Sequence, residues 1–409
     1  MGSFSTALSG LSANSVALNT IGNNLANLNT TAFKKQTTNF ENLFYQQIGV
    51  NGSNDALQVG AGTKVASTTT SFLQGHIDPT GNATDMAIGG DGFFVVQQNG
   101  VQSLTRAGSF QLDSYGNLTT AEGENVMGYN AVNGVISGSS SLTPLRLPTG
   151  STESARATQN FSVTANLNAG AAVGTPFSTS IQVYDSLGQT HQAAVTFTKT
   201  AANTWQYDVS LPAGDFTGTA ANTTGTLTFD SSGKLVTPAA NVTGITFPGL
   251  PNGASDLSFE WNLYDSSGNA TISQTTAASA ASARTQDGFT SGVYNGFGVD
   301  SNGIITATYS NGQTETIGQV AIATVANNQG LRITGNNNFV ATAASGQPNI
   351  GVAGTGSRGM ITDNALELSN VDISTEFANL IVAQRAFEAN SKTVTTFDTV
   401  TQDTLSMIR

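Results

Sequence analysis

Towards its C-terminus the chain carries apolar side chains at a seven-residue spacing, the pattern of a helix that packs along one seam. Only Thr401 breaks this step. Asp372 is suited to cap the first turn, and neither Gly nor Pro follows it, so the pattern predicts a helix from about Asp372 to Ile408. The seam of this helix comprises Ile373, Phe377, Leu380, Phe387, Val394, Phe397, Leu405 and Ile408.

The N-terminal residues repeat the same heptad pattern until an Asn/Thr cluster after Asn27 ends it. Packing the two terminal helices only against each other would be marginal, because the apolar surface that they bury barely offsets the entropy of ordering them. We therefore expect the seams to be buried mainly by neighbouring copies of the chain; a two-helix coiled coil within one monomer is the alternative. The N-terminal seam comprises Phe4, Leu8, Leu11, Leu18, Ile21, Leu25 and Leu28.

Between the helices the pattern changes to short runs in which apolar and polar residues alternate, which predicts half-buried strands. The expected fold is mainly β, with nested discontinuous β domains and long N- and C-terminal α-helices forming a coiled-coil-like inner domain. Loose Pro/Gly/Ser and Ala/Ser/Thr stretches bracket an inserted block. The predicted domains are a helical inner domain (1–32 and 372–409), linker or hinge segments (33–72 and 358–371), a β-rich middle domain (73–145 and 285–357) and an inserted β-rich outer domain (146–284).

A tetrapeptide Asp-Ser-x-Gly recurs between the predicted strands at unequal intervals. The Asp side chain can bond the backbone two residues on, and the Gly can take the left-handed conformation that closes a hairpin. Calcium binding is disfavoured because no copy continues into the ligand series of a calcium loop. We interpret the copies as turns; they begin at Asp113, Asp185, Asp230, Asp265 and Asp300.

Composition excludes several classes of function. The net charge of −12 and the 14 scattered Lys and Arg residues argue against nucleic-acid binding, and there are no cysteines for disulfides or thiolate sites. We find no transmembrane span and no cleaved signal peptide. His76 and His191 lack acidic partners at ligand spacing, so we predict no catalytic, metal or cofactor site and no enzyme activity.

Several segments resemble the bacterial flagellar rod and hook axial protein family. They run from Asn23 to Lys34, from Asp85 to Val96, from Thr105 to Asp113, and from Leu366 through Asp372 to Asn390. Ala32 stands where that family usually has Gly, which leaves the turn less free to take a positive φ. The residues that carry the signature are Asn27, Thr31, Phe33, Lys34, Asn370, Val371, Asp372, Gln384, Arg385 and Asn390.

The inserted block favours the hook branch of this family over the shorter distal rod proteins. The resemblance implies an extracellular structural subunit that polymerises into a curved helical tube, a flexible universal joint that transmits torque from rod to filament. It further implies export through the flagellar type III apparatus without a cleaved signal, and contacts with rod proteins, hook–filament junction proteins and the hook cap. A distal rod protein is the first alternative, and a secreted β-rich adhesin the second.

Overall fold

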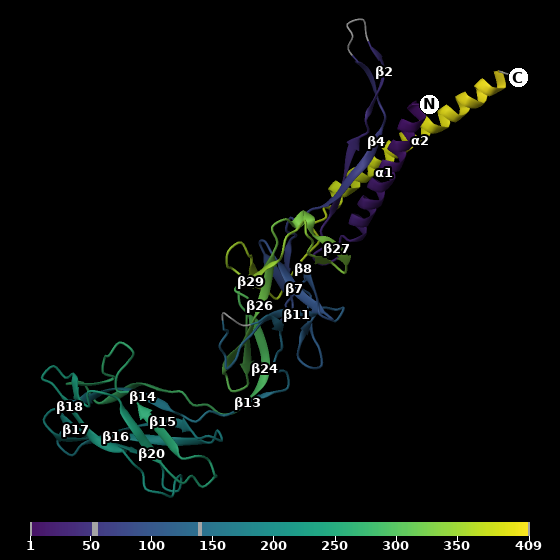
Figure 1. Cartoon of the computed structure of the whole chain (residues 1–409). Coiled ribbons are helices and arrows are strands. Elements are labelled where there is room, and N and C mark those ends of the chain that lie inside the picture. The colour runs from purple at the N-terminus through teal and green to yellow at the C-terminus, as the bar shows by residue number, and fades with distance from the viewer. Residues whose placement is uncertain (1, 51–55, 138–140, 408–409) are drawn as a thin grey trace. The chain divides into compact units, whose positions relative to one another are not determined.

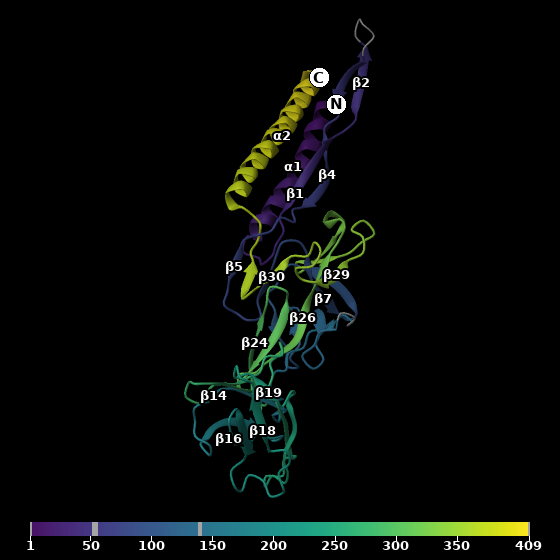
Figure 2. The same cartoon turned by 90° about the vertical axis from the view of Figure 1, so that its left-hand side faces the viewer.

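The computed structural model describes residues 2–50, 56–137 and 141–407. Its contacts divide the chain into two units (Figures 1 and 2). Unit 1 comprises Met1–Thr149, Phe297–Ala307 and Glu315–Arg409, and unit 2 comprises Gly150–Gly296 and Thr308–Thr314. The described chain consists mainly of strands, with a long helix near each end, so the predicted fold class is confirmed.

The two terminal helices belong to unit 1 and run side by side (Figure 2). Helix α1 spans Gly2–Ala26 and helix α2 spans Ile373–Met407, as predicted, while Ile408 lies outside the described residues. Asp372 caps α2 because its Oδ1 accepts a hydrogen bond from the Thr375 N–H at 2.7 Å. Beyond Ala26 the chain turns, and the Thr30 hydroxyl donates to Asn27 Oδ1 at 3.0 Å.

Strands occupy both segments that we predicted to be linkers or hinges. Segment 33–72 folds into a long hairpin in which β1 pairs with β4 and β2 with β3, all antiparallel. Its Thr-rich stretches place β-branched side chains on both paired strands, a preference that the scattered Gly and Asn residues obscured. Segment 358–371 contains β30 and β31, which pair with β6 and β5. The hairpin strands are β1 Gln36–Asn42, β2 Tyr45–Val50, β3 Ala56–Gly60 and β4 Thr63–Thr70.

The remaining strands of unit 1 form a sheet in which β26, β11, β7, β8, β28 and β27 are successive neighbours. Its core contains Phe93, Leu104, Met127 and Phe339, and Phe72 packs edge-on against Phe93. The bounds are β5 Ile77–Pro79, β6 Met86–Gly89, β7 Phe93–Gln98, β8 Val101–Thr105, β9 Gln111–Leu112, β10 Leu118–Thr119, β11 Asn125–Asn130, β12 Thr143–Pro144, β26 Thr314–Thr324, β27 Arg332–Gly335, β28 Asn338–Val340, β29 Asn349–Val352, β30 Met360–Asp363 and β31 Ala365–Glu367, with a 3₁₀ turn at Asn328–Gly330.

Unit 2 contains two five-stranded sheets, ordered β20-β21-β14-β22 with β23 beside β14, and β15-β16-β17-β18-β19. Both tryptophans, Trp205 and Trp261, are fully buried in its core, and the alternation of buried and exposed residues in β17 and β21 follows the sequence pattern. The bounds are β13 Thr152–Glu153, β14 Asn160–Asn168, β15 Pro176–Tyr184, β16 Thr190–Ala201, β17 Thr204–Ser210, β18 Thr224–Phe229, β19 Leu235–Thr237, β20 Val242–Phe247, β21 Leu257–Trp261, β22 Ile272–Thr275 and β23 Ala280–Gln286, while β24 Gly292–Val299 and β25 Ile304–Tyr309 have residues in both units.

The repeated Asp-Ser-x-Gly segments are turns, as predicted. In the first copy Asp113 Oδ1 accepts from the N–H groups of Tyr115 and Asn117, both at 2.8 Å. The other four copies repeat this arrangement, and every closing Gly has a positive φ. Each of these turns is therefore held by its own few residues.

Candidate assembly interface

Helix α1 turns a stripe of small residues towards the rest of unit 1. A Cβ atom on Gly10 would lie 2.9 Å from Asn390 Oδ1, so α2 approaches α1 closely at this point. Sequence reasoning selected the large apolar residues and missed this stripe, although its spacing of three and four residues is a helical signal. The buried positions of α1 are Ala7, Gly10, Ala13, Ala17 and Asn24.

Leu28 lies in the turn after α1, so its assignment to a helical seam is wrong, whereas the other described seam residues lie on the paired helices. None of the described seam residues is buried in the single chain. Phe4 and Leu8 are 43% and 51% exposed. The chain therefore leaves uncovered the apolar surface that a self-contained coiled coil would bury. Exposed members are Phe4, Leu8, Ile373, Phe377 and Leu405; half-buried members are Leu11, Leu18, Ile21, Leu25, Leu28, Leu380, Phe387, Val394 and Phe397; Ile408 lies outside the described residues.

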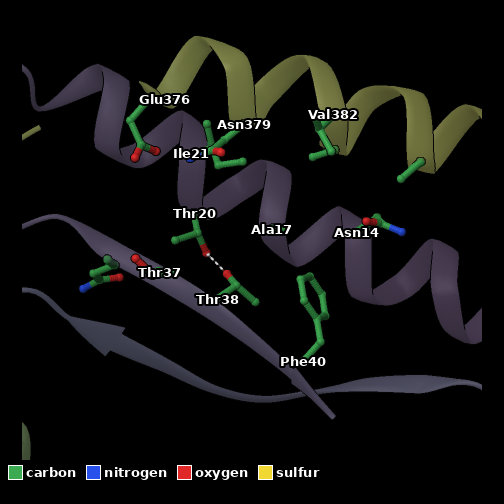
Figure 3. A pocket seen from close by; sticks show the side chains of 13 residues that line it. Asn14, Ala17, Thr20, Ile21, Thr37, Thr38, Phe40, Glu376, Asn379 and Val382 are labelled. Atoms are coloured by element: carbon green, nitrogen blue, oxygen red, sulfur yellow. Dashed lines mark hydrogen bonds between the residues drawn. The ribbon is translucent and has the colours of Figure 1, made fainter. Parts of the chain in front are cut away.

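A polar junction joins the two helices to the first strand of the hairpin. Asn24 Nδ2 donates to the Gln36 carbonyl at 2.8 Å and to Glu376 Oε2 at 3.1 Å, while Asn24 Oδ1 accepts from the Gln36 N–H at 2.9 Å. Beside this junction lies a cavity of about 270 Å³ between α1, β1 and α2 (Figure 3). Thr20 and Thr38 close part of its wall through a hydroxyl–hydroxyl hydrogen bond of 2.9 Å, and Phe40 packs beside them.

A buried ion cluster connects the end of the N-terminal signature to β31 and to Arg106, the residue that follows β8. Glu367 accepts from Lys34 Nζ at 2.6 Å, from Arg106 Nη1 at 3.3 Å and from the Gly75 N–H at 2.7 Å. Burial lowers the pKa of Lys34 and of Arg106 from their ordinary values, although Glu367 acts to raise both. One carboxylate thus holds two buried cations that come from distant parts of the sequence.

Most residues of the family signature make contacts within the chain. Asn370 Oδ1 accepts from the Lys35 N–H at 2.8 Å, and its Nδ2 donates to the carbonyls of Ser71 and Leu73 at 2.9 Å. The Thr31 carbonyl accepts from Asn337 Nδ2 at 2.8 Å. Phe33 is half-buried, Val371 is buried, and Asn390 Nδ2 donates to the Ala386 carbonyl at 2.8 Å, whereas Gln384 and Arg385 are exposed.

Ala32 adopts a left-handed conformation with φ of 57°. Its side chain is buried, and its N–H donates to the Glu367 carbonyl at 2.7 Å. The turn therefore takes a positive φ even though an alanine occupies it, at a conformational cost of about 1 kcal/mol or more.

In unit 2 His191 has two acidic partners, so the prediction that neither histidine has one is wrong for this residue. Its Nδ1 lies 3.0 Å from Asp215 Oδ2, and its Nε2 lies 3.3 Å from Asp185 Oδ2. Burial acts to raise the pKa of Asp185, but hydrogen bonds from Asn252, the Gln189 N–H, His191 and the Leu187 N–H outweigh it and lower the pKa. Asp185 lies in the turn just before β16, the strand that holds His191, whereas Asp215 comes from a later loop that sequence spacing does not connect with His191. His76 is exposed.

None of the helices in the described residues is both long enough and apolar enough to span a bilayer. Within the same residues there is no group of three or more His, Asp or Glu side chains arranged to hold a metal ion.

Four family models match parts of the sequence. They are described as Flagella basal body rod protein (residues 4–34), Flagellar hook protein FlgE/F/G D1 domain (87–186), Flagellar basal body protein FlaE D2 domain (166–289) and Flagellar basal body rod FlgEFG protein C-terminal (362–407). Together they extend over both helices and much of both units.

Full-length relatives agree with these models. The flagellar hook protein FlgE of Escherichia coli K12 is 36% identical over 97% of this chain and 98% of its own length, and that of Treponema pallidum is 34% identical over the full length of both. The crystal structure of Helicobacter pylori flagellar hook protein FlgE2 superposes on 71% of this chain and all of its own, with a TM-score of 0.56 and 16% sequence identity. That superposition supports the fold.

Proposed function

The chain belongs to the flagellar hook protein FlgE family and is a structural subunit of the hook, and from this premise we propose how its terminal helices assemble. The hook is a polymer of one subunit, so each copy must present surfaces that other copies cover. We assign this role to the apolar seams of α1 and α2. The observation that carries the proposal is that every described seam residue stays half-buried or exposed in the single chain.

The seams suit a contact that repeats from one subunit to the next. Head-to-tail contacts that do not close on themselves generate a helical tube, and paired helices packed along it resist twisting. Torque then passes through the helical layer. Bending requires neighbouring β domains to slide past each other, which surfaces rich in Ser, Thr and Asn with few charges allow at small cost.

Membership of the family supports a domain layout, an export route and further partners for this chain. We propose that 1–32 and 372–409 form the inner domain, that 33–72 and 358–371 connect it to the middle domain (73–145 and 285–357), and that 146–284 is the outer domain. The subunit is exported through the flagellar apparatus without a cleaved signal peptide. Its further partners are rod proteins, hook–filament junction proteins and the hook cap.

A polymerisation assay tests the seam assignment. Leu25→Asp or Phe387→Asp places a charge where packed apolar surface is needed, so we expect loss of tubes under negative-stain electron microscopy. The tryptophan fluorescence of unit 2 should be unchanged, because both tryptophans lie there.

Thr395→Asp is the matched control, because Thr395 is exposed on α2 outside the seam and its replacement should leave tubes intact. Tubes formed by Leu25→Asp or Phe387→Asp at the normal critical concentration would refute the assignment.

A further inference from the structure

Glu376 is a buried acid without a cationic partner. It is 5% exposed, and no ion pair among the described residues includes it. Within the described part of the chain, its side chain accepts one hydrogen bond, from the neutral amide of Asn24 at 3.1 Å. Since burying a charged carboxylate is costly unless a cation compensates it, Glu376 is suited to receive a cationic partner from outside the single chain.

The cavity beside Glu376 has room for a side chain from outside. Its walls come from α1, β1 and α2, and Glu376 and Asn379 lie on the α2 side of it (Figure 3). Ala17, Ile21 and Val382 supply apolar wall, and Val382 is 68% exposed. An occupant should therefore combine an aliphatic stem with a positively charged end.

The terminal helices offer few candidates. Within the described parts of α1 and α2 the cationic residues are Arg385 and Lys392, both exposed and both without an ion pair there. Glu388 lies four residues before Lys392, the favoured orientation for a pair on one helix. Arg385 is left as the better donor, and its planar guanidinium suits a desolvated carboxylate more than an ammonium does.

Glu376 and Arg385 cannot pair within one helix. They are nine positions apart, which at about 100° per residue places them on opposite faces of α2. A helix with an acid on one face and a cation on the other is complementary to another copy displaced along the assembly, as in a head-to-tail contact.

We propose that in the hook Arg385 of one subunit enters this cavity on a neighbouring subunit and pairs with Glu376. This ion pair adds to the seam contact proposed above, and the inference depends on that proposal. The pair would fix the position of one subunit relative to the next, which apolar side chains alone do not define, because a buried carboxylate and a guanidinium bond well in only one relative position.

A double-mutant cycle on polymerisation tests the pairing. Glu376→Gln keeps the shape of the side chain, and Arg385→Gln changes an exposed position, so both variants should fold. We expect each to raise the critical concentration for tube formation about tenfold or more, and the double variant to raise it no further. The double variant Glu376→Arg/Arg385→Glu, in which the two charges are exchanged, should form tubes at a lower concentration than the single variants Glu376→Arg and Arg385→Glu.

The control is Lys392→Gln, which should leave the critical concentration nearly unchanged. Additive effects of Glu376→Gln and Arg385→Gln, or no effect of either, would overturn the pairing while leaving the assembly of the wild-type chain in place. Failure of the wild-type chain to form tubes would instead refute the proposed function of the seams.

Discussion

Replacing Glu367 by Gln tests whether the buried ion cluster stabilises unit 1. The side chain of Glu367 has no exposed surface, and those of Lys34 and Arg106 are 1% and 5% exposed. Glu367 Oε1 accepts from both Lys34 Nζ and the Gly75 N–H, and Oε2 accepts from Arg106. In either orientation, a Gln amide NH₂ would face one of these donors, and both cations would lose their counter-charge.

Breaking a buried pair by removing one charge typically costs about 3–5 kcal/mol. For a unit of this size such a loss lowers the unfolding midpoint by about 10 °C. Hydrogen exchange in β7 and β8 should therefore accelerate strongly in Glu367→Gln. The tryptophan fluorescence transition of unit 2 serves as an internal reference and should not move.

The exposed pair of Lys64 and Glu41 provides the matched control. Lys64 Nζ lies 2.7 Å from Glu41 Oε1, but the Lys64 side chain is 58% exposed and the Glu41 side chain 47%. Glu41→Gln should therefore lower the free energy of unfolding by less than about 1 kcal/mol. Equal effects of the two substitutions would show that burial does not set the strength of the Glu367 cluster. A loss below about 1 kcal/mol for Glu367→Gln would refute the reasoning.

Three other predictions concern single positions. Ala32→Val should destabilise unit 1 by about 2 kcal/mol, because a β-branched residue tolerates φ of 57° poorly, whereas Ala32→Gly should stay within about 1 kcal/mol of wild type; denaturant unfolding followed by hydrogen exchange measures both. Gly108→Ala should cost about 3 kcal/mol or more by the same measurement, since its Cβ would lie 1.6 Å from the Met86 carbonyl oxygen. Asp185→Asn should destabilise unit 2 at neutral pH, and the difference from wild type should vanish in strong acid. The lowered pKa of Asp185 means that its stabilisation is present above about pH 4 and is lost as the pH falls through the folded-state pKa, which a pH series of tryptophan-monitored unfolding checks.

The sequence predicted the features that depend on neighbouring residues. The heptad spacing located both helices, and the Asp and Gly of each repeated tetrapeptide determined a turn without help from the rest of the chain. Alternation around Trp205 and Trp261 located two strands of unit 2. These signals lie within short stretches of sequence, so they can be recognised without knowledge of the fold.

Features that depend on distant residues were missed. The hairpin at 36–70 has little apolar alternation, and it forms because β1 and β4 pair with each other beside α1. The Glu367 cluster and the Asn24–Glu376 contact join residues hundreds of positions apart, and the two carboxylates that face His191 come from different loops. For the proposed interface, the heptad spacing directed attention to the large apolar residues, so the small-residue face that α1 turns towards the rest of unit 1 was missed.

The contact between Asn24 and Glu376 spans 352 positions of sequence, and this separation bears on the order of folding. Joining two points that far apart in an unfolded chain costs about 5 kcal/mol of loop-closure entropy. The cost falls once the intervening β strands have formed, so we expect refolding followed by pulsed hydrogen exchange to protect those strands before the helices. The cavity at Glu376 and the paired seams would then be completed in the last step. If the seams form the assembly contact proposed above, a partly folded subunit would lack that contact surface, and only completely folded copies could join the growing tube.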